Sequence, residues 1–212
     1  MSDFSINCAE CPRLAEHLAG VRAEYPDYHA RPVPPFGDPR PRLLIVGLAP
    51  GMHGANATGR PFTGDYAGIL LYETLHRYGY ANLPESVAAD DRLRLKGARI
   101  TNAVKCLPPA NKPTTAEIKT CNRYLGDELA ALKGRMVILA LGRIAHEAVL
   151  RALELKPKDH PFGHNTAYQL EGGRWLVSSY HCSRYNTQTR RLTEKMFHSV
   201  FNKIDKLLNT SS

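Results

Sequence analysis

The stretch Arg42-Leu-Leu-Ile-Val-Gly-Leu48 decides the fold, because a short run that is apolar on both faces is typical of a buried parallel strand. Further strands are expected at residues 99–104, 136–141, 167–170 and 175–179, with a turn at Gly172-Gly173 between the last two. Segments with helical spacing separate the earlier strands. This alternation predicts an α/β fold, a three-layer α/β/α sandwich around a mostly parallel central sheet.

Helices are expected at residues 12–24, 66–78, 142–153 and 189–208, and another begins after Thr114. Thr114 and Glu117 have the spacing of a capping box, in which each side chain bonds the other residue's backbone. The proline-rich residues 31–41 predict an extended connector between the first helix and the main body, because proline fixes φ and removes a donor.

Composition indicates a globular protein. The chain has 212 residues, of which 43% are hydrophobic and 23% charged, so we expect one domain over residues 1–212. It contains no apolar run long enough to span a membrane, and its first residues do not resemble a signal peptide. We therefore expect a monomer in the reducing cytoplasm, where cysteines are more often ligands or catalytic groups than disulfides.

The net charge of +8 favours contact with a polyanion, and nucleic acid is the commonest. The alternative is a basic protein with no such partner. Three polar segments bear on this choice, at residues 47–65, 101–111 and 181–193. Each follows an expected strand, and ligands bind beyond the carboxyl ends of parallel strands. The sequence therefore predicts one site where these segments converge.

Four cysteines have a spacing that suits a metal centre. Cys8 and Cys11 form a close pair, whereas Cys106 and Cys121 must reach that pair through folding. Four thiolates suit either zinc or an iron–sulfur cluster. Structural zinc more often uses two close pairs, so the spacing favours iron–sulfur. The alternative is four unconnected core cysteines, since cysteine is often buried.

The first polar segment contains five glycines in 19 residues, which lets backbone approach a ligand closely. It is neither a Walker A loop nor a dinucleotide fingerprint. Phe62 could stack on a flat ring, or it could be an ordinary core aromatic. Asp65 could orient a water molecule, or it could simply cap the helix that follows it.

The other two segments supply further candidates. Asn102 could hydrogen-bond the edge of a base, or it could be a turn residue. His181 could stabilise charge on a carbonyl oxygen. The polar residues that follow His181 suit phosphate contacts, although a solvated turn has the same composition. They are Ser183, Arg184, Asn186, Arg190 and Arg191.

Together these residues resemble the uracil-DNA glycosylase superfamily, within it the iron–sulfur members, and among those the family 5 (type b) branch. The four cysteines resemble the cluster ligands. Gly47-Leu-Ala-Pro-Gly51 and Arg60-Pro-Phe-Thr-Gly-Asp65 resemble the first active-site motif. His181-Cys-Ser183, with Asn186 and Arg191-Leu-Thr193, resembles the second. The resemblance covers nearly the whole chain.

The resemblance implies a monofunctional glycosylase of base excision repair that removes uracil, and also hypoxanthine or xanthine, from nucleoid DNA. It implies a [4Fe-4S] cluster on the four cysteines. Asp65, His181 and Asn102 would be catalytic. Phe62, Asn102, Gly47 and Ala49 would bind the flipped base, and the residues after His181 would bind the DNA backbone. A base must leave the duplex to reach such a pocket.

The sequence departs from the usual motifs of this superfamily at two places. The position after the first strand where classical members carry a polar Asp, Asn or Glu falls here in Leu48-Ala-Pro-Gly51, and Cys182 stands where the second motif usually has proline. The missing early side chain keeps an alternative open, a non-catalytic iron–sulfur protein that binds damaged or single-stranded DNA. A third alternative is covalent capture of DNA through the motif histidine, as in one branch of the superfamily. The extra basic loop of that branch is not evident in this sequence.

Overall fold

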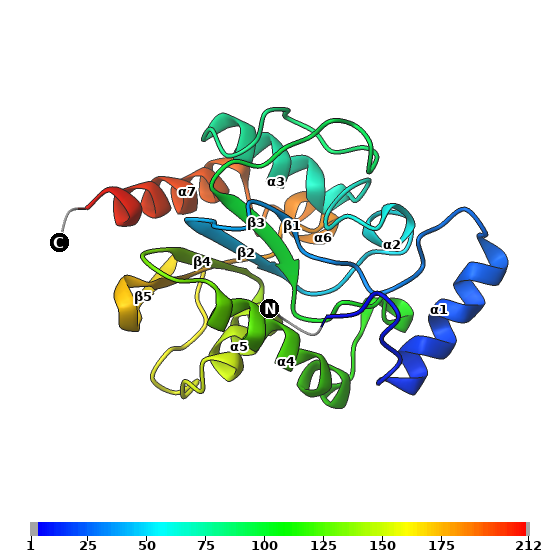
Figure 1. Cartoon of the computed structure of the whole chain (residues 1–212). Coiled ribbons are helices and arrows are strands. Elements are labelled where there is room, and N and C mark those ends of the chain that lie inside the picture. Colours follow the sequence, from blue (N-terminus) through cyan, green and yellow to red (C-terminus); the bar gives the residue numbers. More distant parts are fainter. Residues whose placement is uncertain (1–3, 211–212) are drawn as a thin grey trace.

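The computed structural model describes residues 4–210. Its centre is one six-stranded sheet with the strand order β1-β3-β2-β4-β6-β5 (Figure 1). The four inner strands are parallel, and the two edge strands are antiparallel to their neighbours. The strands are β1 (Phe36–Gly37), β2 (Leu43–Gly47), β3 (Ala98–Asn102), β4 (Val137–Leu141), β5 (Thr166–Gln169) and β6 (Trp175–Ser179).

Helices cover both faces of the sheet, because successive side chains of a buried strand point to opposite faces. Leu43 and Ile45 of β2 face the core under α3 (Tyr66–Arg77) and α7 (Glu194–Asn209). Leu44 and Val46 face the core under α4 (Thr115–Ala131) and α5 (Arg143–Ala152). The predicted α/β/α sandwich with a mostly parallel sheet is confirmed.

A third apolar cluster joins α1 (Pro12–Glu24) to the segment after β3 and to α4. Arg13 strengthens this junction with a two-pronged ion pair, in which Nε and Nη2 each lie 2.7 Å from a carboxylate oxygen of Glu117. Glu117 also completes the predicted capping box with Thr114. Apolar packing and a bidentate, charge-assisted ion pair therefore hold the N-terminal helix against the middle of the chain.

The structure corrects some expected elements. The final helix begins at Glu194 rather than near residue 189, because Thr193 caps it by accepting a hydrogen bond from the Met196 backbone. A short helix, α6 (Arg184–Gln188), precedes it. The proline-rich connector contains β1, and the glycine-rich loop contains α2 (Ala55–Thr58). Gly172 and Gly173 do form the turn between β5 and β6, both with positive φ.

No helix among residues 4–210 is both long and apolar enough to cross a membrane.

Candidate active site

Two cavities open at the carboxyl edge of the sheet, and both are lined by Leu48 and His181. The Asp65 cavity has a volume of about 490 Å³, and the Arg191 cavity about 400 Å³. The predicted residues that line the Asp65 cavity are Ala49, Phe62, Asp65, His181, Ser183 and Arg184. Those that line the Arg191 cavity are His181, Asn186 and Arg191. Asn111, at the end of the second polar segment, also lines the Asp65 cavity, so the three polar segments do converge. Asn102 and Gly47 line neither cavity.

Asp65 precedes α3, but its side chain makes no capping bond to that helix. The carboxylate instead points across the loop, where its Oδ2 accepts a hydrogen bond from the Ala55 backbone at 3.0 Å. Two glycines make room for it, because a Cβ on Gly51 or Gly54 would lie 2.3 or 2.0 Å from its Oδ1. Burial raises the pKa of Asp65 above its usual value, while the backbone hydrogen bonds of Ala55 and Gly51 oppose that rise. A half-buried carboxylate in a cavity can accept a proton from a water molecule.

Gly47 allows Asn102 and Phe62 to approach each other. Gly47 lies opposite Asn102 in the register of β2 and β3. A Cβ on Gly47 would lie 2.4 Å from Asn102 Oδ1 and 2.7 Å from Phe62 Cζ. The Asn102 side chain is buried, and its Oδ1 has no hydrogen-bond partner among residues 4–210. A buried acceptor beside an aromatic ring can receive an N–H from a flat heterocycle.

His181 closes the Asp65 cavity opposite Phe62. The two rings are nearly parallel, with centroids 6.0 Å apart and planes at 27°. Burial lowers the pKa of His181 to about 4, so the imidazole is neutral near pH 7. The Asn186 side chain donates a hydrogen bond to the His181 carbonyl at 2.8 Å, which fixes the backbone at this turn. A neutral imidazole N–H that faces a cavity can stabilise a developing oxyanion.

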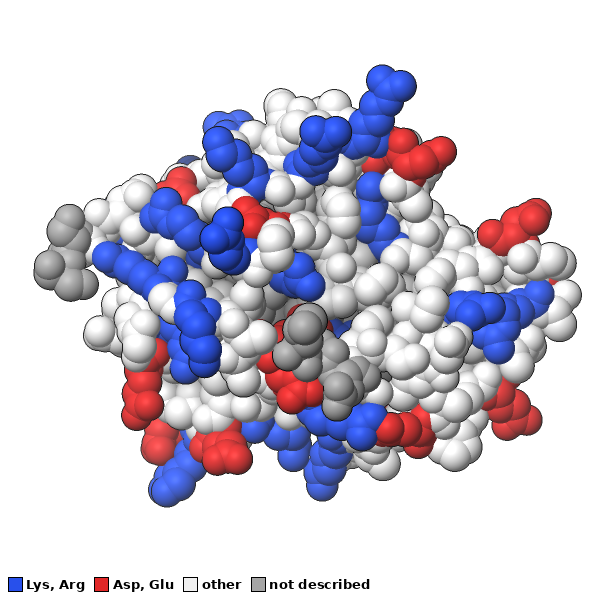
Figure 2. Space-filling view, viewed as in Figure 1, with Lys and Arg blue, Asp and Glu red and all other residues white. Residues whose placement is uncertain are grey.

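Two arginines are held over aromatic rings beside the cavities. Arg184 lies 4.9 Å from the centre of the Tyr66 ring, and Arg191 lies 4.9 Å from that of Tyr180. Arg190 is exposed and lines neither cavity. On the face that Figure 2 shows, basic side chains are spread widely with acidic ones among them. The two stacked arginines are therefore better-defined candidates for anion contacts than the general charge surplus.

The four cysteines converge away from these cavities, around a small cavity of about 20 Å³. Cys8 accepts a hydrogen bond from the Tyr124 hydroxyl at 3.2 Å, and Cys121 accepts one from the Lys105 backbone at 3.3 Å. Burial and the neighbouring thiols, Cys121 above all, raise the pKa of Cys11 to about 11 and that of Cys106 to about 12. The four thiols lie around one small cavity and form one potential ligand set.

The distances between the four cysteine sulfurs distinguish a single zinc ion from an iron–sulfur cluster. Among the described residues, no three of the four sulfurs lie within 4.8 Å of one another. A single zinc ion with bonds of about 2.3 Å would hold its ligand sulfurs roughly 3.8 Å apart. A cluster with a separate iron for each thiolate needs a wider spacing.

The sequence reasoning did not find several residues at the site. Tyr66 and Asn111 line the Asp65 cavity, whereas Arg143, Phe162 and Tyr180 line the Arg191 cavity. Arg143 could have been predicted from the sequence, because it lies two residues after β4, at the edge of the sheet where ligands bind. Asn111 ends the second polar segment, so its place at this edge was predicted although no role was assigned to it. Tyr185, on α6, is the most exposed large apolar side chain among the described residues, at 70%.

Cys182 is fully buried, and burial raises the pKa of its thiol to about 12. It is therefore an unreactive thiol rather than an exposed, oxidation-prone one.

Comparison with known proteins gives a consistent result. Residues 34–205 match the uracil DNA glycosylase superfamily. A type-5 uracil-DNA glycosylase from Thermus thermophilus is 50% identical over 94% of this chain and 93% of its own length. One from Mycobacterium tuberculosis is 45% identical over 94% of this chain and 78% of its own. A type-4 uracil-DNA glycosylase from Pyrobaculum aerophilum is 35% identical over 69% of this chain and 61% of its own.

Proposed function

The chain belongs to the uracil DNA glycosylase superfamily, and from that premise we propose that the residues around Asp65 and His181 cleave the N-glycosidic bond of a base flipped out of DNA. Its similarity to type-5 relatives makes it a uracil-DNA glycosylase, a DNA-repair hydrolase of N-glycosyl bonds. One observation carries the assignment of residues. A carboxylate, an aromatic ring and a neutral imidazole line a single cavity, and a buried amide oxygen without a partner among residues 4–210 lies beside that aromatic ring, across Gly47.

The Asp65 cavity suits a flipped base. Phe62 would stack on the ring, and Asn102 would bind the base edge across the space that Gly47 leaves. Ala49 and Gly51 present little side chain to the cavity, so a volume of about 490 Å³ leaves room for purines as well as uracil. We therefore propose DNA that contains uracil, hypoxanthine or xanthine as the substrate.

The DNA backbone would follow the loop after His181. Ser183 and Arg184 would contact phosphates near the Asp65 cavity, Asn186 and Arg191 would do so beside the Arg191 cavity, and Arg190 would lie further along. Tyr185 has the exposure needed to enter the space that the flipped base leaves. Apolar side chains commonly act as such wedges in bent or opened duplexes.

The chemistry follows from the two titratable groups. Asp65 would orient a water molecule and accept its proton while the water oxygen bonds to the sugar carbon. The bond to the base breaks, and the bonding electrons leave with the base. The His181 N–H would stabilise the negative charge on the departing carbonyl oxygen. No lysine among the described residues lines either cavity, so water rather than an amine is the expected nucleophile of a monofunctional enzyme.

Cys8, Cys11, Cys106 and Cys121 would hold a [4Fe-4S] cluster. Their mutual approach and wide sulfur spacing support it over zinc. When bound, the cluster would supply a covalent cross-link between the N-terminal segment, the segment after β3 and α4. Since one chain provides every residue of the site, we propose that the enzyme works as a monomer.

A base-release panel tests this function. Duplexes with uracil, hypoxanthine, xanthine or a thymine mispair are incubated with the protein and then treated with alkali. We expect strand breaks at uracil and at the purines. An intact strand with retained binding would instead indicate a non-catalytic DNA-binding protein, and a protein–DNA adduct would indicate covalent capture.

A further inference from the structure

Phe62 occupies a strained position in a tight turn. The Thr63 backbone donates a hydrogen bond to the Arg60 carbonyl at 3.2 Å, so Arg60-Pro61-Phe62-Thr63 is a β-turn. Pro61 at the second position and the positive φ of 58° at Phe62 are the features of a type II turn. The third position of such a turn favours glycine, so a phenylalanine persists there only if its surroundings hold it.

Tyr72 of α3 holds the central peptide of this turn. Types I and II differ mainly in the orientation of that peptide, whose carbonyl belongs to Pro61. The Tyr72 hydroxyl donates a hydrogen bond of 2.6 Å to that carbonyl. Tyr72 is fully buried, and burial raises its pKa to about 12, so the hydroxyl remains a donor. Gly68 lets the turn lie against α3, since a Cβ there would lie 2.0 Å from the Phe62 carbonyl oxygen.

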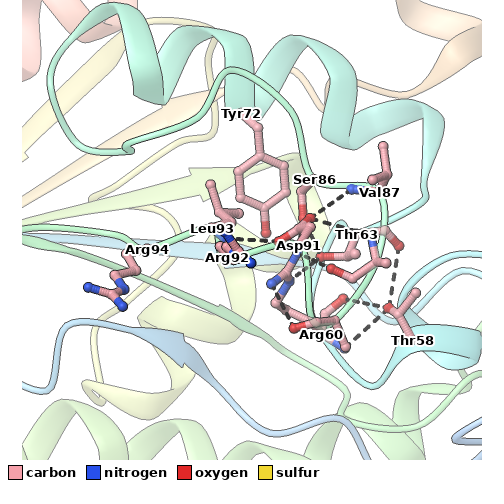
Figure 3. Close-up of polar contacts among 12 residues, drawn as sticks. Thr58, Arg60, Thr63, Tyr72, Ser86, Val87, Asp91, Arg92, Leu93 and Arg94 are labelled. Carbon is pink, nitrogen blue, oxygen red and sulfur yellow. Dashed lines mark hydrogen bonds and ion pairs between the residues drawn. The ribbon is translucent and has the colours of Figure 1, made fainter.

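Arg60 holds the ends of the same turn. Its guanidinium is buried, donates to Thr63 Oγ1 at 2.7 Å and lies 2.6 Å from Asp91 Oδ2 (Figure 3). Asp91 in turn accepts backbone hydrogen bonds from Val87 and Leu93. The turn is therefore attached to residues 86–93 at its ends and to α3 at its centre.

We propose that Tyr72 is a positioning residue for base excision, which acts by holding the Pro61–Phe62 peptide in the orientation that presents the Phe62 ring to the flipped base. Arg60 and Asp91 support it from the other side. This inference rests on the proposed function. Without the Tyr72 hydrogen bond, the peptide can rotate to the type I form. Phe62 then takes a negative φ, and its ring no longer lines the Asp65 cavity.

The test is Tyr72→Phe, which removes one oxygen atom. We expect the single-turnover rate on uracil-containing DNA to fall roughly 10-fold, because a buried carbonyl loses its partner and the turn relaxes. Affinity for a non-cleavable 2′-fluorouridine duplex should fall as well. Affinity for abasic DNA, which has no base to stack, should stay within twofold. Tyr80→Phe is the matched control, because its hydroxyl bonds Asp205 outside the site. It should change none of the three readouts.

An unchanged rate and analogue affinity in Tyr72→Phe would overturn the proposal. A parallel loss of abasic-DNA affinity and active fraction would also overturn it, because that pattern indicates a general structural role. If Tyr72→Phe does not fold, Asp91→Asn takes its place with the same expected pattern. A wild-type protein that releases no base would instead contradict the proposed function itself.

Discussion

Gly47 and Asn102 lie directly opposite each other where β2 and β3 end, and a Cβ on Gly47 would come within 2.4 Å of Asn102 Oδ1. The same added atom would lie 2.7 Å from the Phe62 ring. A residue with no side chain thus brings the amide that would bind the base edge next to the ring that would stack on the base.

Gly47→Ala should therefore slow uracil release. The added methyl must displace Asn102 or Phe62, and a displacement of about 1 Å at a reacting centre can cost about 10²-fold in rate. The measurement is the single-turnover rate on uracil-containing DNA. Gly20→Ala is the control, because a Cβ at Gly20 meets no atom within 4 Å. A Gly47→Ala enzyme with the wild-type rate would show that the close approach has no catalytic role.

Asp65→Asn should remove the acid limb of the pH profile. The pKa of Asp65 is raised above 3.8 by burial, so the wild-type carboxylate is protonated at a higher pH than an exposed one. Its rate should fall as pH drops through that raised pKa, whereas His181, whose pKa is lowered to about 4 by burial, should add no change near neutral pH. Asp65→Asn should be slow at every pH, while affinity for a substrate analogue is retained.

Asp127→Asn, on the exposed side of α4, is the control for that experiment. Retention of full rate by Asp65→Asn would move catalysis to His181 and to the backbone dipoles of the glycine-rich loop.

Cys106→Ser should lose both colour and stability. The wild-type protein is expected to be brown, with the broad visible absorbance of a thiolate-bound iron–sulfur centre. Loss of one ligand should bleach that absorbance and lower Tm, because the cluster would join three distant segments. Cys182→Ala should keep the colour, since Cys182 lies beside His181 rather than with the other four. A colourless wild-type protein that contains stoichiometric zinc after anaerobic preparation would refute the cluster.

Local patterns predicted much of this fold from the sequence. The capping box at Thr114 and the apolar strand at residues 42–48 each depend on a few neighbouring residues, so the sequence alone predicts them. The start of α7 was misplaced because Thr193 supplies the cap, and a lone threonine is a weak signal. The type II turn at Phe62 could not be predicted, because the contacts that hold its positive φ come from Tyr72 and from Arg60 with its partner Asp91.

Arg191 and Arg190 should differ in their effect on DNA binding, although they are adjacent in sequence. Arg191 is held over Tyr180 and lines a cavity, whereas Arg190 lines neither cavity. Arg191→Ala should weaken binding to abasic DNA and reduce the slope of log affinity against log salt by about 1, because one phosphate contact is lost. Arg190→Ala should have a smaller effect on the slope, and Arg151→Ala, in the last turn of α5, should have none.

Arg191→Lys should restore most of the slope but not all of the affinity, because a lysine keeps the charge and loses the planar stacking on Tyr180. An unchanged slope in Arg191→Ala would remove the Arg191 cavity from the DNA path and leave the backbone contacts to Ser183 and Arg184 beside the Asp65 cavity.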